Sequence, residues 1–130
     1  ENAANLKISN AFNPRTISSS TTTNGTGIDT KGYESLTFAI TSGTLTDGSY
    51  TPLVQESDDN SSYSDVADAD LTVTEASVAF ASTDDNVTKK IGYTGNKRYA
   101  RLSIVSATVT TGGTIGAVAI QGHAANGPVA

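Results

Sequence analysis

The chain has 130 residues, of which 16% are charged and 6% aromatic, and its formal net charge is −5 at pH 7. It contains no Cys, which excludes disulfides, thiolate nucleophiles and thiolate-bound metal sites. Its acidic balance argues against free nucleic acid as a partner, and no apolar run approaches the ~18 residues needed to cross a bilayer.

The first part of the chain is expected to be an extended N-terminal arm, residues 1–16, followed by one β-sandwich domain, residues 17–130. In the arm, Leu6 and Ile8 alternate with polar residues, and no turn dipeptide precedes Asn13-Pro14. Its order is expected to depend on what it contacts, and the alternative is a disordered segment.

The rest of the chain is predicted to form short strands separated by turns. The clearest strand is 34–41, where Leu36, Phe38 and Ile40 point one way and the residues between them the other. Asp47-Gly48 is typical of a turn. The other expected strands are 17–23, 50–57, 63–66, 76–81, 87–93, 99–109 and 114–121.

The long strand near Leu102 shows the same alternation, with Ala100 and Ile104 also expected to face inward and Ser103 outward. Residues 110–113 predict a tight hairpin into the final strand. Regularly spaced short strands without helical periodicity predict an all-β fold, a single-domain antiparallel β-sandwich of jelly-roll-like type.

Features that would support catalysis are few. His123 is the only His and is expected to be an exposed loop residue, so a triad has no second candidate for its base. The acidic pairs Asp58-Asp59 and Asp84-Asp85 are expected to satisfy backbone groups of turns. The chain also has no Trp to line the sugar cleft of a glycosidase. We therefore expect a non-enzymatic protein with no catalytic residues and no cofactor.

A calcium site is the alternative reading of the acidic residues. Asp58, Asp59, Asn60 and Asp65 bring together the oxygen ligands that Ca²⁺ prefers. Their spacing does not match the regular calcium-binding loop, and the segment contains no Gly. The sequence therefore predicts no metal site.

Charge is segregated along the chain: every charged residue from 44 to 86 is acidic, and every one from 87 to 130 is basic. If strands 87–93 and 99–109 pair through the turn between them, the bases form one patch suited to an acidic partner. The alternative is that the acids fill turns and the bases line a solvated strand. The five bases are Lys89, Lys90, Lys97, Arg98 and Arg101.

Three stretches resemble small virion proteins of tailed bacteriophages and prophages: residues 48–71 (GSYTPLVQESDDNSSYSDVADADL), 90–104 (KIGYTGNKRYARLSI) and 113–123 (GTIGAVAIQGH). Tyr63 stands where many of these relatives are expected to have Trp. The resemblance implies a capsid decoration, or cement, protein with a jelly-roll-like sandwich. Such a protein is made in the cytoplasm of the bacterial host and lies on the outer surface of the phage head.

The resemblance implies two partners, the major capsid protein and copies of the chain itself as a dimer or trimer, and neither nucleic acid nor a membrane. The sequence leaves two alternatives open: a carbohydrate-binding or adhesin module of a tail or fibre, and a head–tail or tail-tube component. The candidate capsid or inter-subunit contacts are Leu6, Ile8 and Phe12 of the arm, with Lys89, Lys90, Lys97, Arg98 and Arg101.

Overall fold

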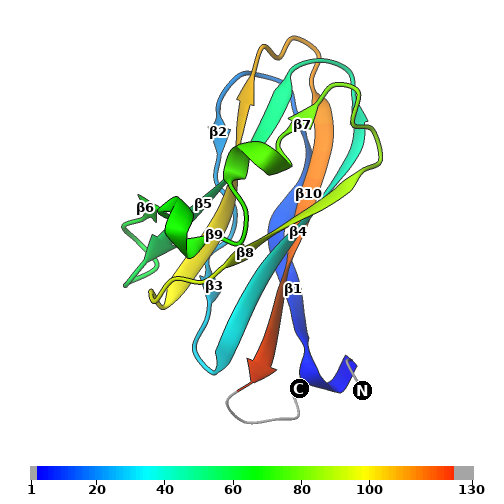
Figure 1. Ribbon diagram of the computed structural model, residues 1–130. Coiled ribbons are helices and arrows are strands. Elements are labelled where there is room, and N and C mark those ends of the chain that lie inside the picture. Colours follow the sequence, from blue (N-terminus) through cyan, green and yellow to red (C-terminus); the bar gives the residue numbers. More distant parts are fainter. Residues whose placement is uncertain (1–2, 125–130) are drawn as a thin grey trace.

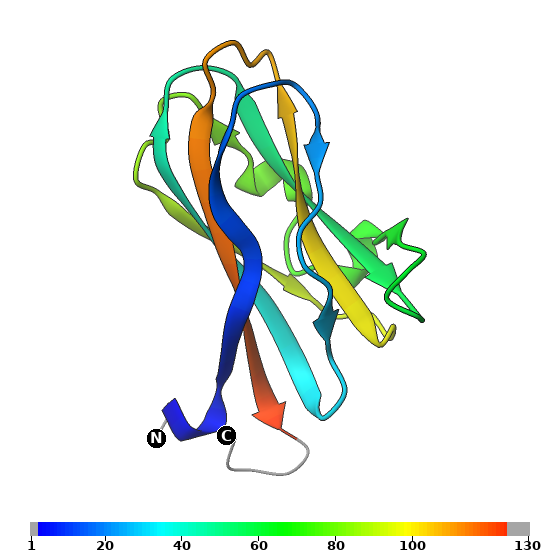
Figure 2. The same cartoon turned by 180° about the vertical axis from the view of Figure 1, so that it is seen from behind.

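The computed structural model describes residues 3–124, and residues 1–2 and 125–130 of the expected arm and tail lie outside the described part. Two antiparallel sheets pack face to face (Figures 1 and 2), which confirms the all-β sandwich. The strands are β1 (Lys7–Ile17), β2 (Thr22–Thr23), β3 (Ile28–Asp29), β4 (Tyr33–Leu45), β5 (Ser49–Ser57), β6 (Ser64–Asp65), β7 (Phe80–Ala81), β8 (Thr88–Tyr93), β9 (Tyr99–Ala107) and β10 (Gly113–Ala124). Three short 3-10 helices are η1 (Ala3–Asn5), η2 (Asp68–Asp70) and η3 (Glu75–Val78). Within residues 3–124, no helix has the length and apolar character needed to span a membrane.

The strand order is that of a jelly roll. Sheet A has the order β1-β10-β4-β8, and sheet B has the order β2-β9-β5-β6, with β3 also paired to β9 and β7 to β5. We count β2 and β3 as one interrupted strand on the free edge of β9, and β6 and β7 as another on the free edge of β5. Numbered this way along the chain, the strands run 1-8-3-6 in sheet A and 2-7-4-5 in sheet B, the jelly-roll arrangement that was predicted.

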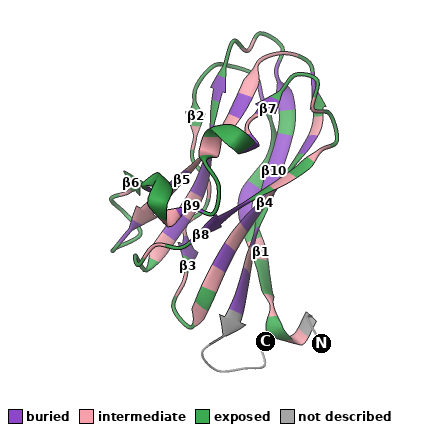
Figure 3. Ribbon diagram, in the orientation of Figure 1, coloured by how far each residue is buried: buried purple, intermediate pink, exposed green. Residues whose placement is uncertain are grey.

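The core lies between the two sheets and follows the period-two alternation of the long strands. Figure 3 shows buried residues alternating with partly exposed ones along β4. Because successive side chains of a strand point to opposite faces, the alternation places one set of residues in the core. The predicted inward residues are all buried: Leu36, Phe38, Ile40, Ala100, Leu102 and Ile104.

The outward prediction for Ser103 is wrong, because this residue is fully buried. Its hydroxyl lies within hydrogen-bonding distance of the side-chain oxygens of Asn24, at 3.3 Å, and Gln55, at 3.4 Å. Both residues cover the outer face of sheet B at this point, so a position that alternation assigns to solvent is enclosed.

The predicted strand 76–81 is also wrong over most of its length. Residues Glu75–Val78 form the 3-10 helix η3, and only Phe80–Ala81 pair as a strand. Val78 and Phe80 are nevertheless buried. A 3-10 turn followed by extended residues therefore buries the same two side chains that a strand would.

Two turns that were expected to join paired strands instead cross between the sheets. Residues 110–113 connect β9 of sheet B to β10 of sheet A, and the turn after Tyr93 connects β8 of sheet A to β9 of sheet B. Turn residues mark where the chain reverses, but they do not determine which strand the next segment pairs with. The predicted hairpin at 110–113 is therefore wrong, and the pairing of strands 87–93 and 99–109, on which the single basic patch depends, does not form.

The leading segment is extended but does not stand apart from the sandwich. β1 pairs antiparallel with β10 from Lys7 opposite Gln121 to Ile17 opposite Gly113, so it runs across the expected boundary after residue 16. Bulges in β1 lie on both sides of Phe12, whose side chain is fully buried in the core. Phe12 is thus enclosed by its own domain and is not available as a contact to a partner.

We predict that Phe12→Ala lowers the free energy of unfolding by about 3–5 kcal/mol, because it leaves a cavity in a closed core. Ile8→Ala, on the same strand but 64% exposed, should change it by about 0.5 kcal/mol or less. Urea unfolding followed by tyrosine fluorescence measures both. Equal, small effects would show that β1 is dispensable for the fold.

One carboxylate holds the crossover from β9 to β10. Asp47 accepts backbone hydrogen bonds from Thr110 at 3.0 Å, Thr111 at 2.8 Å and Gly112 at 3.0 Å. The bond from Thr111, followed by those from Thr110 and Gly112, lowers the pKa of Asp47 below its usual value. Three donors on one acid thus fix a loop that connects the two sheets.

Gly112 is required at the end of this crossover. Its φ of 104° lies in the left-handed region, and a Cβ there would come within 1.9 Å of the carbonyl oxygen of Ile17. A side chain at this position would therefore force β1 and the crossover apart.

We predict that Asp47→Asn lowers the urea midpoint at neutral pH and that this deficit shrinks in acid. The folded-state pKa of Asp47 is below its unfolded value, near 3.8. Its contribution is therefore present above the unfolded pKa and is lost as the pH falls through the lower folded value. Urea unfolding at a series of pH values measures the difference. Asp68→Asn, at an exposed acid with no such bonds, is the control and should match the unsubstituted protein at neutral pH.

Candidate docking face and polar cleft

The predicted single basic patch does not form, because its two strands belong to different sheets. β8, with Lys89 and Lys90, pairs with β4 in sheet A. β9, which carries Arg101, pairs with β5 in sheet B. The five bases are therefore distributed over the molecule, and the prediction of one surface made from them is wrong.

Two bases in the loop before β9 form ion pairs with acids from earlier in the chain. Lys97 contacts Asp58 at 2.9 Å. Arg98 donates two hydrogen bonds to Asp29, at 3.1 and 2.9 Å, which lowers the pKa of that carboxyl. Both pairs are well exposed, so each contributes little to stability.

Arg101 lies on the outer face of sheet B. Its guanidinium donates a 2.9 Å hydrogen bond to the side chain of Gln55 and stands 4.1 Å from the centre of the Tyr63 ring. Tyr63 is therefore held by a cation and is not part of an inner packing layer.

Lys89 lies on β8, an edge strand of sheet A, and contacts the segment from Ala79 to Asp84. Its ammonium donates to the carbonyl of Ala79 at 2.6 Å, lies 3.6 Å from a carboxylate oxygen of Asp84, and stands 4.9 Å from the centre of the Phe80 ring. The Lys89 ammonium is therefore engaged by groups of its own domain.

Lys90 is the exception among the five bases. It is exposed, and no ion pair, hydrogen bond or ring contact engages it among the described residues. Lys90 pairs with Ala39 of β4, which places it on the outer face of sheet A. Of these five bases, it is the one whose charge is free for a partner.

The predicted contact residues of the arm also differ in how far they are exposed. Ile8 is 64% exposed and pairs with Ile120, on the outer face of sheet A. Leu6 is half-buried near Gly122, where an added Cβ would lie 3.1 Å from the Leu6 side chain. Ile8 is therefore the arm residue best placed for contact with another molecule.

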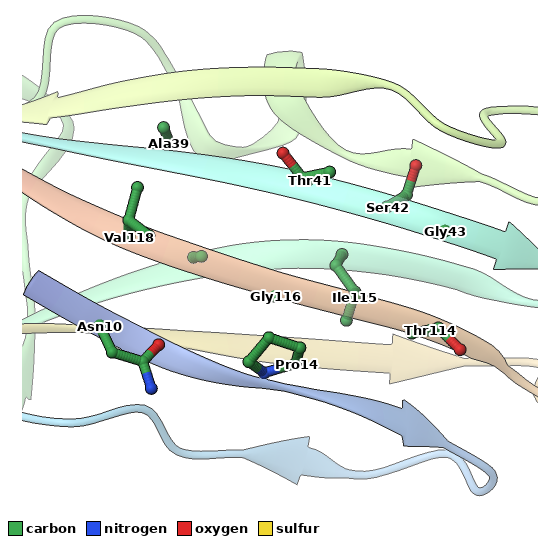
Figure 4. Close-up of a pocket in the computed structure, with 11 residues that line it drawn as sticks. Asn10, Pro14, Ala39, Thr41, Ser42, Gly43, Thr114, Ile115, Gly116 and Val118 are labelled. Atoms are coloured by element: carbon green, nitrogen blue, oxygen red, sulfur yellow. The ribbon is translucent and has the colours of Figure 1, made fainter.

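The outer face of sheet A contains an apolar groove of about 340 Å³. Figure 4 shows it along β10, between β1 and β4. Asn10 and Ala39 pair with Val118 from opposite sides, and Thr41 pairs with Gly116, so these outward residues form adjacent rows. The residues that shape the groove include Asn10, Pro14, Ala39, Thr41, Gly116 and Val118.

The groove exists because β10 has no side chain at Gly116. A Cβ there would lie 3.0 Å from the Cα and Cγ atoms of Pro14, tighter than ordinary contact. Pro14 also removes a backbone donor from the edge strand, which is one way in which natural sheets avoid edge-to-edge association. Val118, 38% exposed, stands beside this gap. We define the docking face as Ile8, Asn10, Ala39, Lys90, Gly116 and Val118.

Sequence reasoning identified Ile8 and Lys90 of this face and missed its centre. The strand 114–121 was predicted, but without an assignment of its faces. The signal in the sequence that could have indicated the groove was the period-two set of Gly116 and Val118, in which a position without a side chain is followed by an apolar one.

The start of β4 and the end of β8 lie side by side (Figure 1). A second hollow, with a volume of about 390 Å³, is lined by residues at these two strand ends and by the loop after β8. We call it the polar cleft. It shares no lining residue with the apolar groove. The side chains that give it its character are Tyr33, Glu34, Ser35, Thr94, Asn96 and Lys97.

Tyr93 forms the inner wall of this cleft and joins the two sheets. Its hydroxyl donates to a carboxylate oxygen of Glu56 on β5 at 2.7 Å and accepts the N–H of Lys97 at 3.1 Å. Burial, followed by the hydrogen bond to Glu56, raises the pKa of Tyr93. The hydroxyl therefore stays protonated and keeps the wall in place.

The acids of the turns mostly bind backbone N–H groups, as predicted. Asp59 accepts from Ser61 and Ser62, and Asp84 accepts from Ala81. The bonds from Ser62 and Ser61 lower the pKa of Asp59. Within the described residues, no group of three or more His, Cys, Asp or Glu side chains is arranged to hold a metal ion. The His123 side chain lies outside the described part.

No protein-family model and no curated protein matches the chain. Among solved structures, the crystal structure of PBSX exported protein XepA is similar, with a TM-score of 0.57 and 15% identity over 95% of this chain. This chain corresponds to 39% of that protein's length. The crystal structure of SPBc2 prophage-derived protein YomS has a TM-score of 0.46 and 12% identity, covering 88% of this chain and 92% of that one. The likeness to XepA shows a shared fold.

We predict that Tyr93→Phe destabilises the protein by about 2 kcal/mol. The substitution removes the hydrogen bond to the half-buried Glu56 carboxylate and the acceptor for the backbone N–H of Lys97. Tyr33→Phe is the matched control, since none of the described residues hydrogen-bonds to its hydroxyl, and it should change stability by about 0.5 kcal/mol or less. Thermal unfolding compares the two variants. Equal stabilities would mean that the Tyr93 hydroxyl does not join the sheets.

Proposed function

We propose that this chain is a structural virion protein that decorates the phage head, binding the outside of the major capsid protein lattice through its docking face. On this proposal it is made in the bacterial host cytoplasm and acts on the outer surface of the head. It performs no catalysis and needs no cofactor, nucleic acid or membrane.

The observation that carries this proposal is the apolar groove on sheet A with Ile8 and Val118 on the same face. Asn10 pairs with Val118 and Ile8 with Ile120, so Ile8 and Val118 are diagonal neighbours across β1 and β10. Apolar side chains gathered around a groove on a sheet face gain free energy when a partner covers them.

Lys90 supports a partner with a specific chemistry. It is the free base on this face, and its cross-strand partner Ala39 lines the groove. A capsid surface with an apolar ridge and a nearby carboxylate would be complementary to it. A single such contact is weak, and repetition over a lattice makes it effective.

The sequence resemblance to small virion proteins of tailed phages supports the same proposal. Two of its three stretches contribute to the face: residues 90–104 begin with Lys90, and residues 113–123 contain Gly116 and Val118. The jelly-roll fold shared with PBSX exported protein XepA is compatible with a binding module. Fold alone does not determine function, so the proposal depends on the docking face.

The place of the leading segment in this proposal changes with the structure. Residues 7–17 are a strand of sheet A, so their deletion would damage the fold and would not isolate a capsid contact. Copies of the chain as a dimer or trimer remain a proposed arrangement on the lattice.

We predict that Val118→Asp weakens binding to phage heads by about tenfold or more, because docking would bury an unpaired carboxylate in an apolar contact. Val105→Asp is the matched control: the same residue type, 36% exposed against 38%, on the outer face of the other sheet. Co-sedimentation of the purified variants with heads that lack this protein measures the binding.

Val105→Asp should bind as the unsubstituted protein does, and both variants should unfold at similar temperatures. Equal binding by both variants would reject the docking face, and electron microscopy that fails to find the protein on assembled particles would reject the decoration role.

A further inference from the structure

The polar cleft offers hydrogen-bonding groups that the fold itself does not use. No described residue hydrogen-bonds to the side chains of Glu34, Thr94 or Asn96, all of which are exposed. The Ser35 hydroxyl accepts the N–H of Gly122 at 3.1 Å, and its own proton remains available. The lining of the cleft therefore includes a carboxylate, an amide and two hydroxyls.

The cleft also has an apolar element and rigid walls. Tyr33 lines it, half-buried, at the start of β4, with the Lys7 ammonium 5.9 Å from the centre of its ring. Behind it, the Tyr93 hydroxyl is held between Glu56 and the Lys97 N–H. A volume of about 390 Å³ falls within the range of small-ligand sites, and a second hollow of about 240 Å³ continues along Thr37 and Gly92.

We propose that the polar cleft binds a neutral saccharide. A sugar ring has an apolar C–H face, which matches the Tyr33 ring, and a rim of hydroxyls that donate and accept hydrogen bonds. The Glu34 carboxylate accepts from two neighbouring hydroxyls, and the Asn96 amide both donates and accepts. Side chains of this kind orient a polyhydroxylated ligand without neutralising any charge.

The charges around the cleft disfavour an anion such as phosphate or sulfate. Lys97, the basic residue in the lining, is paired with Asp58 at 2.9 Å. Glu34 contributes an unpaired negative charge. An anion would meet one engaged cation and one repelling carboxylate, whereas a neutral ligand meets hydrogen-bonding groups only.

This site goes beyond the proposed function, because it lies apart from the docking face. The groove and the cleft share no lining residue, so the saccharide site is a separate hollow of the same protein. A decorated particle would then present one saccharide site per copy, and repetition would compensate for weak individual binding.

The test is a titration of the ¹⁵N-labelled full chain, followed by backbone amide NMR, with maltotriose, with chitotriose and with inorganic sulfate. We expect at least one trisaccharide to shift the amides of residues 33–36 and 94–97 selectively and sulfate to shift neither group. Glu34→Gln, at an exposed position that the fold does not use, should weaken that binding by about tenfold, as expected for losing hydrogen bonds to a charged acceptor. Asn96→Ala is a second variant with the same expected direction.

Val118→Asp separates the two proposals: it should retain full saccharide binding while binding heads poorly. Failure of both trisaccharides to shift these amides at tens of millimolar would overturn the saccharide site and leave the docking face standing. A larger response to sulfate than to either trisaccharide, or trisaccharide shifts confined to other residues, would overturn it equally.

Discussion

The carboxylate of Asp47 fixes the point where the chain passes from sheet B to sheet A, since three consecutive N–H groups donate to it. In a jelly roll most connections cross between sheets, so short hairpin loops cannot set the register of the strands, and contacts of this kind must do so. β10 begins immediately after the crossover and lies between β1 and β4. Its register places Gly116 beside Thr41 and Val118 beside Ala39, and a shift by one residue would turn the groove residues into the core. The docking face thus depends on a loop at the end of the sandwich.

The segregation of charge along the sequence is partly offset by ion pairs in the fold. Acids from the middle of the chain meet bases from its last third, as in the pairs Asp58 with Lys97 and Asp84 with Lys89. These pairs place opposite charges side by side that the sequence separates. Exposed pairs of this kind add little stability; their larger effect is to leave Lys90 as the free charge near the groove. An uncancelled charge beside apolar surface favours specificity of docking more than strength.

Alternation made the strands and the core predictable: β4 and β9 bury the residues expected, because period-two patterning is decided within each strand. The partners of those strands were not predictable locally. The turns after Tyr93 and before Gly113 carry ordinary turn residues, yet both lead into the opposite sheet. The prediction of one basic patch was wrong for this reason. The prediction of Phe12 as an exposed contact was wrong because bulges on either side of this residue turn its side chain into the core. Ile8 and Lys90, two of the predicted contacts, are exposed on sheet A; exposure and charge are local properties, whereas the groove requires three strands to be aligned.

β1 begins where β10 ends, with Lys7 opposite Gln121, and the start of β4 lies alongside, with Tyr33 opposite Ala124. The first residue of β1 thus lies about 5 Å from Gln121 near the end of β10, on the adjacent strand and at the pole opposite the Asp47 crossover. A host protein can therefore accept this sandwich within a surface loop, because the two stems of that loop need not move apart.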